Sequence, residues 1–315
     1  MKKRAPIFHG LTILFFSVLS GTLVFWLMGS TASDADENSE IQAHSRLSTV
    51  ITPHIPADLT FAGIRVPLDR PIIKQQLEAE LIYNMHTLPA TILILKRSPQ
   101  WQDTMLTILK SQGIPEDFYY LMVAESAVRN VRSPAGAQGF WQFMPQTAKE
   151  YGMRVDAYVD ERNDPIRATR AAAKYLKRAH GKFGDWAIAA ASYNMGMGGI
   201  NQSMNHQNQA SYFDLHLNSE TSRYLFRILA FKCIMENPSQ YGFYLTPSDS
   251  YQMHSTREVS VNSAINWVSF AKTHGTTLKE LRWLNPWIDS SSLNTTNGES
   301  YQVLIPEKEN STNLE

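Results

Sequence analysis

Apolar residues recur with a helical period along most of the chain. After Pro71 they return at intervals of three to five residues, as they do on one face of a helix. Further apolar stripes follow at residues 93–95 and 105–109, whereas the alternation typical of strands is scarce until near the C-terminus. The pattern therefore predicts a mainly α protein whose principal helical domain spans residues 67–246.

Turn and capping residues divide this domain into helices. Gly113 ends one helix, and Pro115 can open the next at its first turn. Later, Asp185 is placed to cap a short Ala-rich helix that we expect to stop at Gly196.

The composition shifts after Tyr241, where residues 245–250 have the character of a linker. Beyond it we expect a small βααβ module over residues 254–308. About fifty residues bury little core, so we interpret this unit as an accessory module rather than an enzyme. Its predicted elements are a strand at 258–261, helices at 264–274 and 277–284, and a strand at 301–305.

The N-terminus carries a candidate membrane segment. Basic residues at positions 2–4 precede an uncharged apolar run at 7–29, which as a helix would span roughly 35 Å, enough to cross a bilayer. The basic cluster predicts that residues 1–6 stay in the cytoplasm and that the rest is exported, giving a single-pass protein of the inner membrane with a periplasmic domain. The polar residues 30–66 are then a flexible linker.

A cleaved signal peptide is the alternative for this segment. The small residues 31–33 offer a cleavage site, and the product would be secreted or periplasmic. No cysteine directly follows the apolar run, which excludes a lipoprotein anchor.

Composition argues against several classes of function. Lys plus Arg and Asp plus Glu are 29 each, so no overall charge attracts nucleic acid. The single cysteine, Cys233, rules out a disulfide within the chain and is best explained as a buried structural thiol. The nine histidines follow no metal-ligand spacing, so we expect neither a metal nor another cofactor.

Glu125 ends a run that is apolar almost all round. It shares a helix face with Phe118, Leu121 and Met122, where a carboxyl group loses hydration and its pKa rises. A proton retained near neutral pH is what a general acid requires. Glu125 could instead lie at the solvent boundary or pair with Arg129, and periodicity alone does not decide between these positions.

The residues after Glu125 favour a sugar site. A turn-rich loop at 133–139 contains Gly136 and Gly139, which permit a close backbone approach, and residues 140–145 present aromatic and amide side chains. Aromatic planes and amides are suited to stacking on sugar rings and bonding to them. The same residues could form only a loop and a core cluster.

Four ordered motifs resemble those of the lytic transglycosylase family, whose fold is lysozyme-like and related to goose lysozyme. The resemblance covers roughly residues 67–244, and segments 160–165 and 220–224 further resemble its membrane-bound D-type branch. The motifs are Glu125-Ser126-Ala127, Ser133-Pro134-Ala135-Gly136-Ala137, Gly139-Phe140-Trp141-Gln142-Phe143-Met144-Pro145 and Ser192-Tyr193-Asn194-Met195-Gly196.

The resemblance implies roles for individual residues. Glu125 matches the catalytic acid, which protonates the glycosidic oxygen between N-acetylmuramic acid and N-acetylglucosamine in peptidoglycan. Asp160 and Glu161 are expected to form a structural salt-bridge network with Arg162 or Arg167. The residues matching sugar-contact positions are Ser133, Gln142, Met144, Tyr193 and Asn194.

Ordinary glycoside hydrolysis uses two carboxylates, yet no second acid accompanies Glu125 before Glu150. The resemblance implies that the muramic acid's own 6-hydroxyl attacks C1, giving a 1,6-anhydro end without water, in cell wall turnover or remodelling. A hydrolytic muramidase on the same fold and an inactive wall-binding anchor are the alternatives. A helical scaffold with no sugar role leaves the motif order unexplained.

The C-terminal module weakly resembles a LysM glycan-binding module. If it binds glycan, it keeps the enzyme near its substrate and raises the effective substrate concentration; otherwise it is a packing appendage. The expected partner is therefore the peptidoglycan glycan strand, and the sequence indicates no protein partner.

Overall fold

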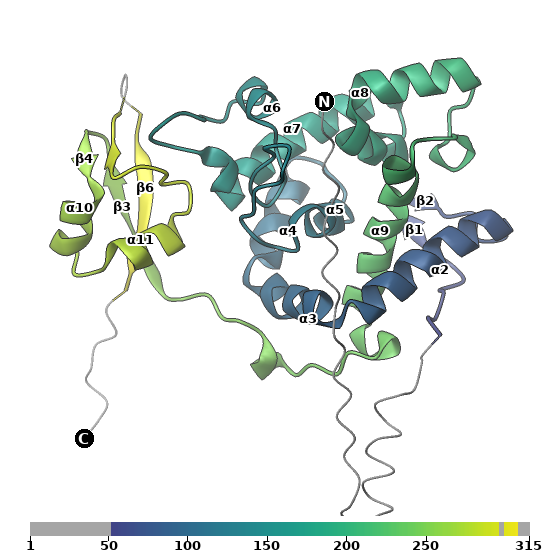
Figure 1. Ribbon diagram of the computed structural model, residues 1–315, viewed down its shortest axis with the longest axis horizontal. Helices are drawn as coiled ribbons and strands as arrows, with labels where there is room; N and C mark the ends of the chain where they lie inside the picture. The colour runs from purple at the N-terminus through teal and green to yellow at the C-terminus, as the bar shows by residue number, and fades with distance from the viewer. Residues whose placement is uncertain (1–51, 296–298, 308–315) are drawn as a thin grey trace, which may run out of the picture. The chain divides into compact units, whose positions relative to one another are not determined.

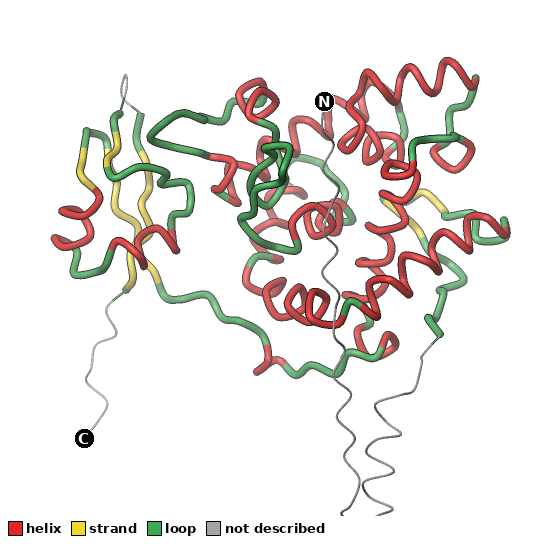
Figure 2. The backbone as a smooth tube through the Cα atoms, in the orientation of Figure 1, coloured by secondary structure: helices red, strands yellow, loops and turns green. Residues whose placement is uncertain are grey.

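The computed structural model describes residues 52–295 and 299–307. Helices dominate the part that precedes the C-terminal module, as Figures 1 and 2 show, and they confirm the prediction of a mainly α protein. The α-helices of this part are α2 (Pro71–His86), α3 (Leu88–Arg97), α4 (Gln102–Ser111), α5 (Phe118–Ser126), α6 (Pro145–Glu150), α7 (Pro165–Phe183), α8 (Trp186–Gln207) and α9 (Ser219–Glu236).

Short elements connect these helices. Strands β1 (Thr60–Phe61) and β2 (Ile64–Arg65) form an antiparallel hairpin before α2. The 3₁₀ turns are η1 (Ser98–Gln100), η2 (Glu161–Asn163), η3 (Tyr212–Asp214), η4 (Pro238–Tyr241) and η5 (Pro247–Asp249).

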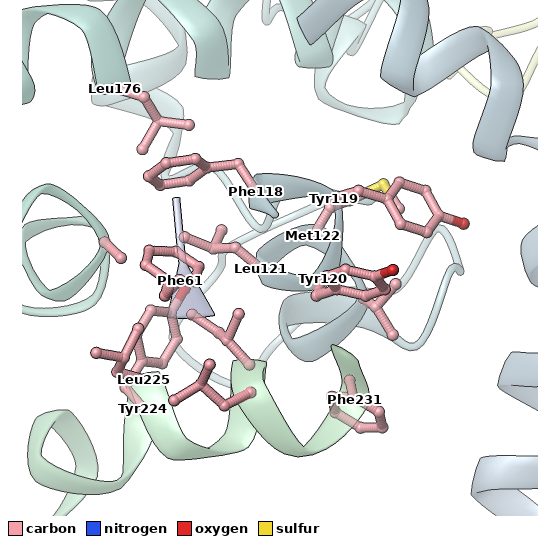
Figure 3. Packing of buried hydrophobic residues seen from close by; sticks show 14 of the residues in the cluster. Phe61, Phe118, Tyr119, Tyr120, Leu121, Met122, Leu176, Tyr224, Leu225 and Phe231 are labelled. Atoms are coloured by element: carbon pink, nitrogen blue, oxygen red, sulfur yellow. The ribbon is translucent and has the colours of Figure 1, made fainter. Parts of the chain in front are cut away.

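Helix α5 lies at the centre of the core. It packs against α4 and α9, and its side chains are buried on every side from Phe118 to Val123. Figure 3 shows Phe118 and Leu121 beside the hairpin residue Phe61, and the ring centroids of Phe61 and Phe118 lie 5.2 Å apart. A buried side chain of this size contributes about 1.5–3 kcal/mol, so the core holds α5 firmly.

Part of the segment predicted to be a flexible linker, residues 30–66, instead belongs to the folded helical domain. Leu59, Phe61 and Val66 are 5%, 0% and 1% exposed and belong to the core of the helical domain. These apolar residues are widely spaced in a polar segment, which is why its composition suggested a tether. The predicted cytoplasmic N-terminus 1–6, the membrane segment 7–29 and the rest of that linker up to residue 51 lie outside the described residues.

The helix predicted to stop at Gly196 continues beyond it. Helix α8 is broken at Gly196, which has φ 81° and ψ 148°, and a second helical stretch then runs to Gln207. Glycine adopts this conformation without steric cost, so the chain changes direction there rather than ending the helix.

The C-terminal module has the predicted strand, helix, helix, strand order. Strands β3 (Thr256–Val261) and β6 (Tyr301–Pro306) pair antiparallel and are separated by α10 (Trp267–Thr273) and α11 (Leu278–Leu284). An additional two-residue pair, β4 (Ile265–Asn266) with β5 (Ser292–Leu293), is too short to show as alternation in the sequence.

The module and the helical domain share specific contacts. Val159 is fully buried in the hydrophobic cluster of the module. The backbone N–H of Asp160 donates to the carbonyl of Trp287 at 3.0 Å, and the Tyr301 hydroxyl donates to Glu161 Oε1 at 3.2 Å. These bonds attach the module to the segment around η2.

Among residues 52–295 and 299–307, no helix combines the length and the apolar character needed to span a bilayer.

Candidate active site

Glu125 lies in the last turn of α5, where the helix leaves the core. The next two residues, Ala127 and Val128, have φ 53° and 57°, so the chain turns sharply after the helix. This turn leaves Glu125 at intermediate exposure although the helix before it is buried. The structure therefore brings the carboxyl group to the edge of the core, and it forms no ion pair with Arg129.

Burial raises the pKa of Glu125 to about 7, because desolvation disfavours the carboxylate. A hydrogen bond from Tyr224 and the charge of Arg227 act in the opposite direction, and Glu220 adds to the rise. The residue as a whole keeps some accessible surface, while its carboxyl group is desolvated. Near neutral pH a substantial fraction of Glu125 is protonated, as general acid catalysis requires.

Two tyrosines flank Glu125. Tyr224 of α9 is 2% exposed and donates its hydroxyl to Oε1 of Glu125. Tyr193 of α8 donates to the carbonyl of Trp141 at 2.8 Å. Burial, followed by the charge of Glu125, raises the pKa of both tyrosines well above the ordinary value. Both phenols consequently stay protonated and serve as hydrogen-bond donors.

Asn194 is exposed beside Tyr193, and its amide is oriented by α9. Thr221 donates its hydroxyl to Oδ1 of Asn194 at 2.7 Å. Since this bond uses the amide oxygen, the Nδ2 group is free to donate to a ligand.

The predicted sugar-contact residues 133–144 form a tightly braced loop. Ser133 Oγ accepts a bond from the Ala137 N–H at 3.0 Å. Gln142, at φ 47°, donates its amide to the carbonyls of Val131 and Gly139 at 2.9 and 2.8 Å. Met144 is 43% exposed at the end of the loop. The loop thus presents Met144 to solvent while Gln142 maintains its shape.

The segment around η2 supports this loop from behind. Nη1 of Arg162 donates to the carbonyls of Gly136 and Phe143 at 2.9 and 3.1 Å. Gly139 lies against the Arg162 carbonyl, which a Cβ atom would approach to 1.8 Å. The predicted close backbone approach therefore occurs at Gly139, whereas Gly136 is needed for its φ of 90° and faces open space.

The acidic residues near η2 are occupied in ion pairs, as the sequence suggested. Asp160 pairs with Arg162 at 2.7 Å and Glu161 with Arg167 at 2.8 Å. The acidic residue that acts electrostatically on Glu125 is Glu220, which is exposed and bonded to Arg227 at 3.1 Å.

A cavity of about 400 Å³ opens beside the end of α5. Ala124 and Ala127, on either side of Glu125 in the chain, line it together with Arg223 and Arg227 of α9. Its volume is within the range of small-ligand sites. Tyr83 of α2 also lines this cavity and is 59% exposed.

Residues 107–215 match the family model of the transglycosylase SLT domain. The matched range includes Glu125, the loop 133–144 and Asn194. Residues 257–309 match the soluble lytic transglycosylase C-terminal LysM-like domain, in agreement with the resemblance of the C-terminal module.

The chain is also similar to curated proteins that are named as transglycosylases. The chain is 28% identical over 206 residues to membrane-bound lytic murein transglycosylase D of Escherichia coli (strain K12), a match that covers 64% of this chain and 45% of that protein. Over 73 residues it is 45% identical to peptidoglycan transglycosylase gp16 of Escherichia phage T7, covering 22% of this chain and 6% of that protein. The chain thus spans less than half the length of either relative.

Among solved structures, an inactive mutant of lytic transglycosylase Slt from Pseudomonas aeruginosa matches with a TM-score of 0.29 and 23% identity. The match covers 44% of this chain and 22% of that chain.

Sequence reasoning did not assign Tyr224 to the candidate site. Its segment was noted for resembling the D-type branch, but nothing in the local pattern shows that a residue 99 positions after Glu125 contacts the acid. Arg227, three residues later, was missed for the same reason.

Proposed function

We propose that the protein is a peptidoglycan lytic transglycosylase in which Glu125 is the single catalytic acid. The observation that carries the proposal is a desolvated carboxyl group with a pKa of about 7, in a segment that matches the SLT domain model. The names of both relatives describe transglycosylases acting on murein or peptidoglycan.

In the proposed reaction Glu125 donates its proton to the glycosidic oxygen as the bond from C1 of N-acetylmuramic acid breaks. The 6-hydroxyl of the same sugar attacks C1, and its proton passes to the Glu125 carboxylate. This step forms the 1,6-anhydro end and restores the acid. The attack is intramolecular and benefits from a high effective concentration.

The side chains around Glu125 supply the contacts that hold the sugars. Tyr193 and Asn194 are suited to the cleaved bond, because each offers a group fixed by a neighbouring element. Met144 offers an apolar surface for a ring. Ser133 and Gln142 bind sugar through the loop that they also shape.

The nature of the cleaved ends tests the proposal. Purified peptidoglycan is digested with the wild type, with Glu125→Gln and with Glu116→Gln, an exposed glutamate just before the same helix, and the fragments are analysed by mass spectrometry. We expect anhydro ends from the wild type and Glu116→Gln and none from Glu125→Gln. Reducing ends would establish the muramidase instead, and no fragments from any sample would favour the inactive wall-binding anchor.

Glu220 offers a second test between transglycosylase and muramidase. A muramidase needs a second carboxylate to activate water, and Glu220 is the acidic neighbour of Glu125. In the transglycosylase Glu220→Gln retains cleavage, whereas in a muramidase that used this group cleavage would fall by several orders of magnitude.

We further propose that residues 7–29 anchor the protein in the inner membrane, with the catalytic domain in the periplasm. The apolar run with its basic flank supports this topology, and one relative is named as membrane-bound. External protease added to spheroplasts should then digest the catalytic domain; survival of the domain contradicts the topology, and release of the intact domain into the medium supports a cleaved signal peptide.

A further inference from the structure

A second cavity, of about 860 Å³, lies apart from the one beside Glu125. Its walls come from the chain just after Glu125, from the end of α3, from the linker before β3 and from α11. The linker is fixed in place, because the Tyr251 N–H donates to the Lys96 carbonyl at 2.8 Å and Gln100 donates to the Gln252 carbonyl at 2.9 Å. The cavity is therefore a built feature of residues 97–304 rather than a gap beside a loose tether.

The charged side chains that line this cavity are all positive. Arg97, Arg129 and Arg282 line it, and none of its lining residues is acidic. None of these three guanidinium groups forms an ion pair with the described residues. Burial and the neighbouring charge of Arg129 lower the pKa of Arg97. Like charges held close together without an acid favour an anionic occupant.

Two polar atoms of the lining also lack partners within the described part of the chain. Nε of Arg282 is buried without an acceptor, although its Nη2 donates to the Ser290 carbonyl at 2.8 Å. Oδ1 of Asn130 is buried without a donor, although Nδ2 donates to the Asn163 carbonyl at 3.0 Å. Both atoms are covered by the surrounding protein, so an occupant meets the arginine charges and the rings of the lining rather than these two atoms.

Aromatic side chains make up much of the remaining surface. Trp101 packs edge-on against Phe140 with centroids 5.4 Å apart, and both line the cavity. Tyr251 and Trp283 are 42% and 58% exposed. Guanidinium groups can bind a carboxylate, and the neighbouring rings can pack against amide and apolar groups of the same ligand. The lining therefore suits a peptide-like chain that carries a carboxylate.

We propose that this cavity binds the carboxylate-bearing peptide stems of the peptidoglycan strand. The assignment rests on the proposed function and implies a preference for peptide-bearing over stripped glycan. Arg129 follows Glu125 by four residues, so at most about 14 Å of backbone separates them. An extended stem of four or five residues covers about 13–18 Å, which allows a muramic acid near the acid to place its peptide in the cavity.

Binding is measured first, on the full-length chain carrying Glu125→Gln, so that the ligand is not cleaved. Isothermal titration uses a disaccharide with a tetrapeptide stem, the same disaccharide without peptide, and inorganic phosphate. Arg97→Glu and Arg129→Glu reverse the charge at two independent positions, and Arg65→Glu makes the same change at an exposed arginine outside the cavity. Circular dichroism checks that each variant is folded.

We expect each cavity variant to weaken binding of the peptide-bearing disaccharide about tenfold or more, the size expected for a lost charged hydrogen bond. Binding of the disaccharide without peptide, and all binding by Arg65→Glu, should not change. Equal affinity for the two sugars, or affinity that charge reversal leaves unaltered, would overturn the proposal. Binding of phosphate as tight as that of the peptide-bearing sugar would identify a general anion site and also overturn it.

The same arginine variants are also made in the protein that keeps Glu125, so that failure of this proposal can be distinguished from failure of the proposed function. We expect kcat/KM on peptide-bearing strands to fall in Arg97→Glu and Arg129→Glu, with kcat/KM on amidase-stripped strands unchanged. If the wild type cleaves neither substrate, the proposed function fails, while the titration still decides whether the cavity binds the peptide.

Discussion

The phenolic hydroxyl of Tyr224 donates a hydrogen bond to Oε1 of Glu125 and thereby links α9 to the last turn of α5. This bond stabilises the carboxylate form, so it opposes the desolvation that raises the pKa of Glu125. The resulting pKa of about 7 is thus a balance in which burial and Glu220 raise the pKa and the Tyr224 hydroxyl and the charge of Arg227 lower it.

Removing this donor should move the pH dependence of cleavage. Tyr224→Phe keeps the ring but loses the bond to the carboxylate, so the pKa of Glu125 should rise further above about 7. Because the acid acts in its protonated form, the limb at which activity falls with rising pH should shift to higher pH. Rates of muropeptide release between pH 5 and pH 9 measure this limb.

The matched control for Tyr224→Phe is Tyr120→Phe. Tyr120 of α5 donates to Glu236 of α9 at 3.1 Å, a tyrosine–glutamate bond between the same two helices that does not involve Glu125. We expect the profile of this variant to overlie that of the wild type. A similar shift in both variants would mean that helix packing, not the bond to Glu125, sets the pH limb.

The raised pKa of Glu125 also makes stability depend on pH. Between its ordinary 4.5 and about 7 the folded protein keeps a proton that the unfolded chain has lost, so rising pH destabilises the wild type. Glu125→Gln lacks this penalty. The free energy of unfolding of Glu125→Gln, relative to that of the wild type, should therefore increase by up to roughly 3 kcal/mol between pH 4 and pH 8.

Urea unfolding of both proteins across this pH range measures the effect. Glu116→Gln, at an exposed position, should show no such pH-dependent gain. A stability difference between Glu125→Gln and the wild type that is constant with pH would show that Glu125 titrates normally.

The buried helix that carries Glu125 could be predicted because it depends on local pattern, whereas the pattern left the position of the Glu125 carboxyl group open. The apolar run before Glu125 predicts a buried helix, and α5 is buried from Phe118 to Val123. The order of strands and helices in the module could also be predicted from local pattern. One local signal is the capping box that Thr277 and Glu280 form at the start of α11.

The remainder of the site depends on contacts between distant segments. Tyr224 meets Glu125 from 99 residues away, and Arg162 reaches the loop carbonyl of Gly136 from 26 residues away. No local periodicity encodes these contacts. The burial of Phe61 was missed for the same reason, because a lone aromatic residue in a polar segment gives no signal of the pocket that receives it.

Alanine at two loop glycines should have different effects. Both positions have positive φ, which costs an L-residue about 1–2 kcal/mol. At Gly139 the added Cβ also lies 1.8 Å from the Arg162 carbonyl, whereas at Gly136 no atom lies within 4 Å. We expect Gly139→Ala to lose about 3–5 kcal/mol and Gly136→Ala only the conformational cost, both measured by urea unfolding. Equal losses would show that the backbone contact at Gly139 yields easily.

The buried pair of Asp160 and Arg162 should be the ion pair most sensitive to removal of one partner. Their side chains are 11% and 6% exposed, and Arg162 also holds two carbonyls of the loop. Arg162→Met leaves the Asp160 carboxylate buried and unpaired, which should cost about 3–5 kcal/mol. The double variant Asp160→Asn with Arg162→Met removes both charges and should recover part of that loss.

The exposed pair of Arg70 and Asp214 provides the comparison for Arg162→Met. Its atoms are 2.7 Å apart, but the side chains are 41% and 42% exposed, so Arg70→Met should cost no more than about 1 kcal/mol. If Arg162→Met were no more harmful than Arg70→Met, the η2 segment would not brace the loop. The double variant separates charge from loop bracing, because it carries no unpaired buried charge. If it recovers stability but not cleavage rate, the lost rate is due to the two missing carbonyl contacts of Arg162.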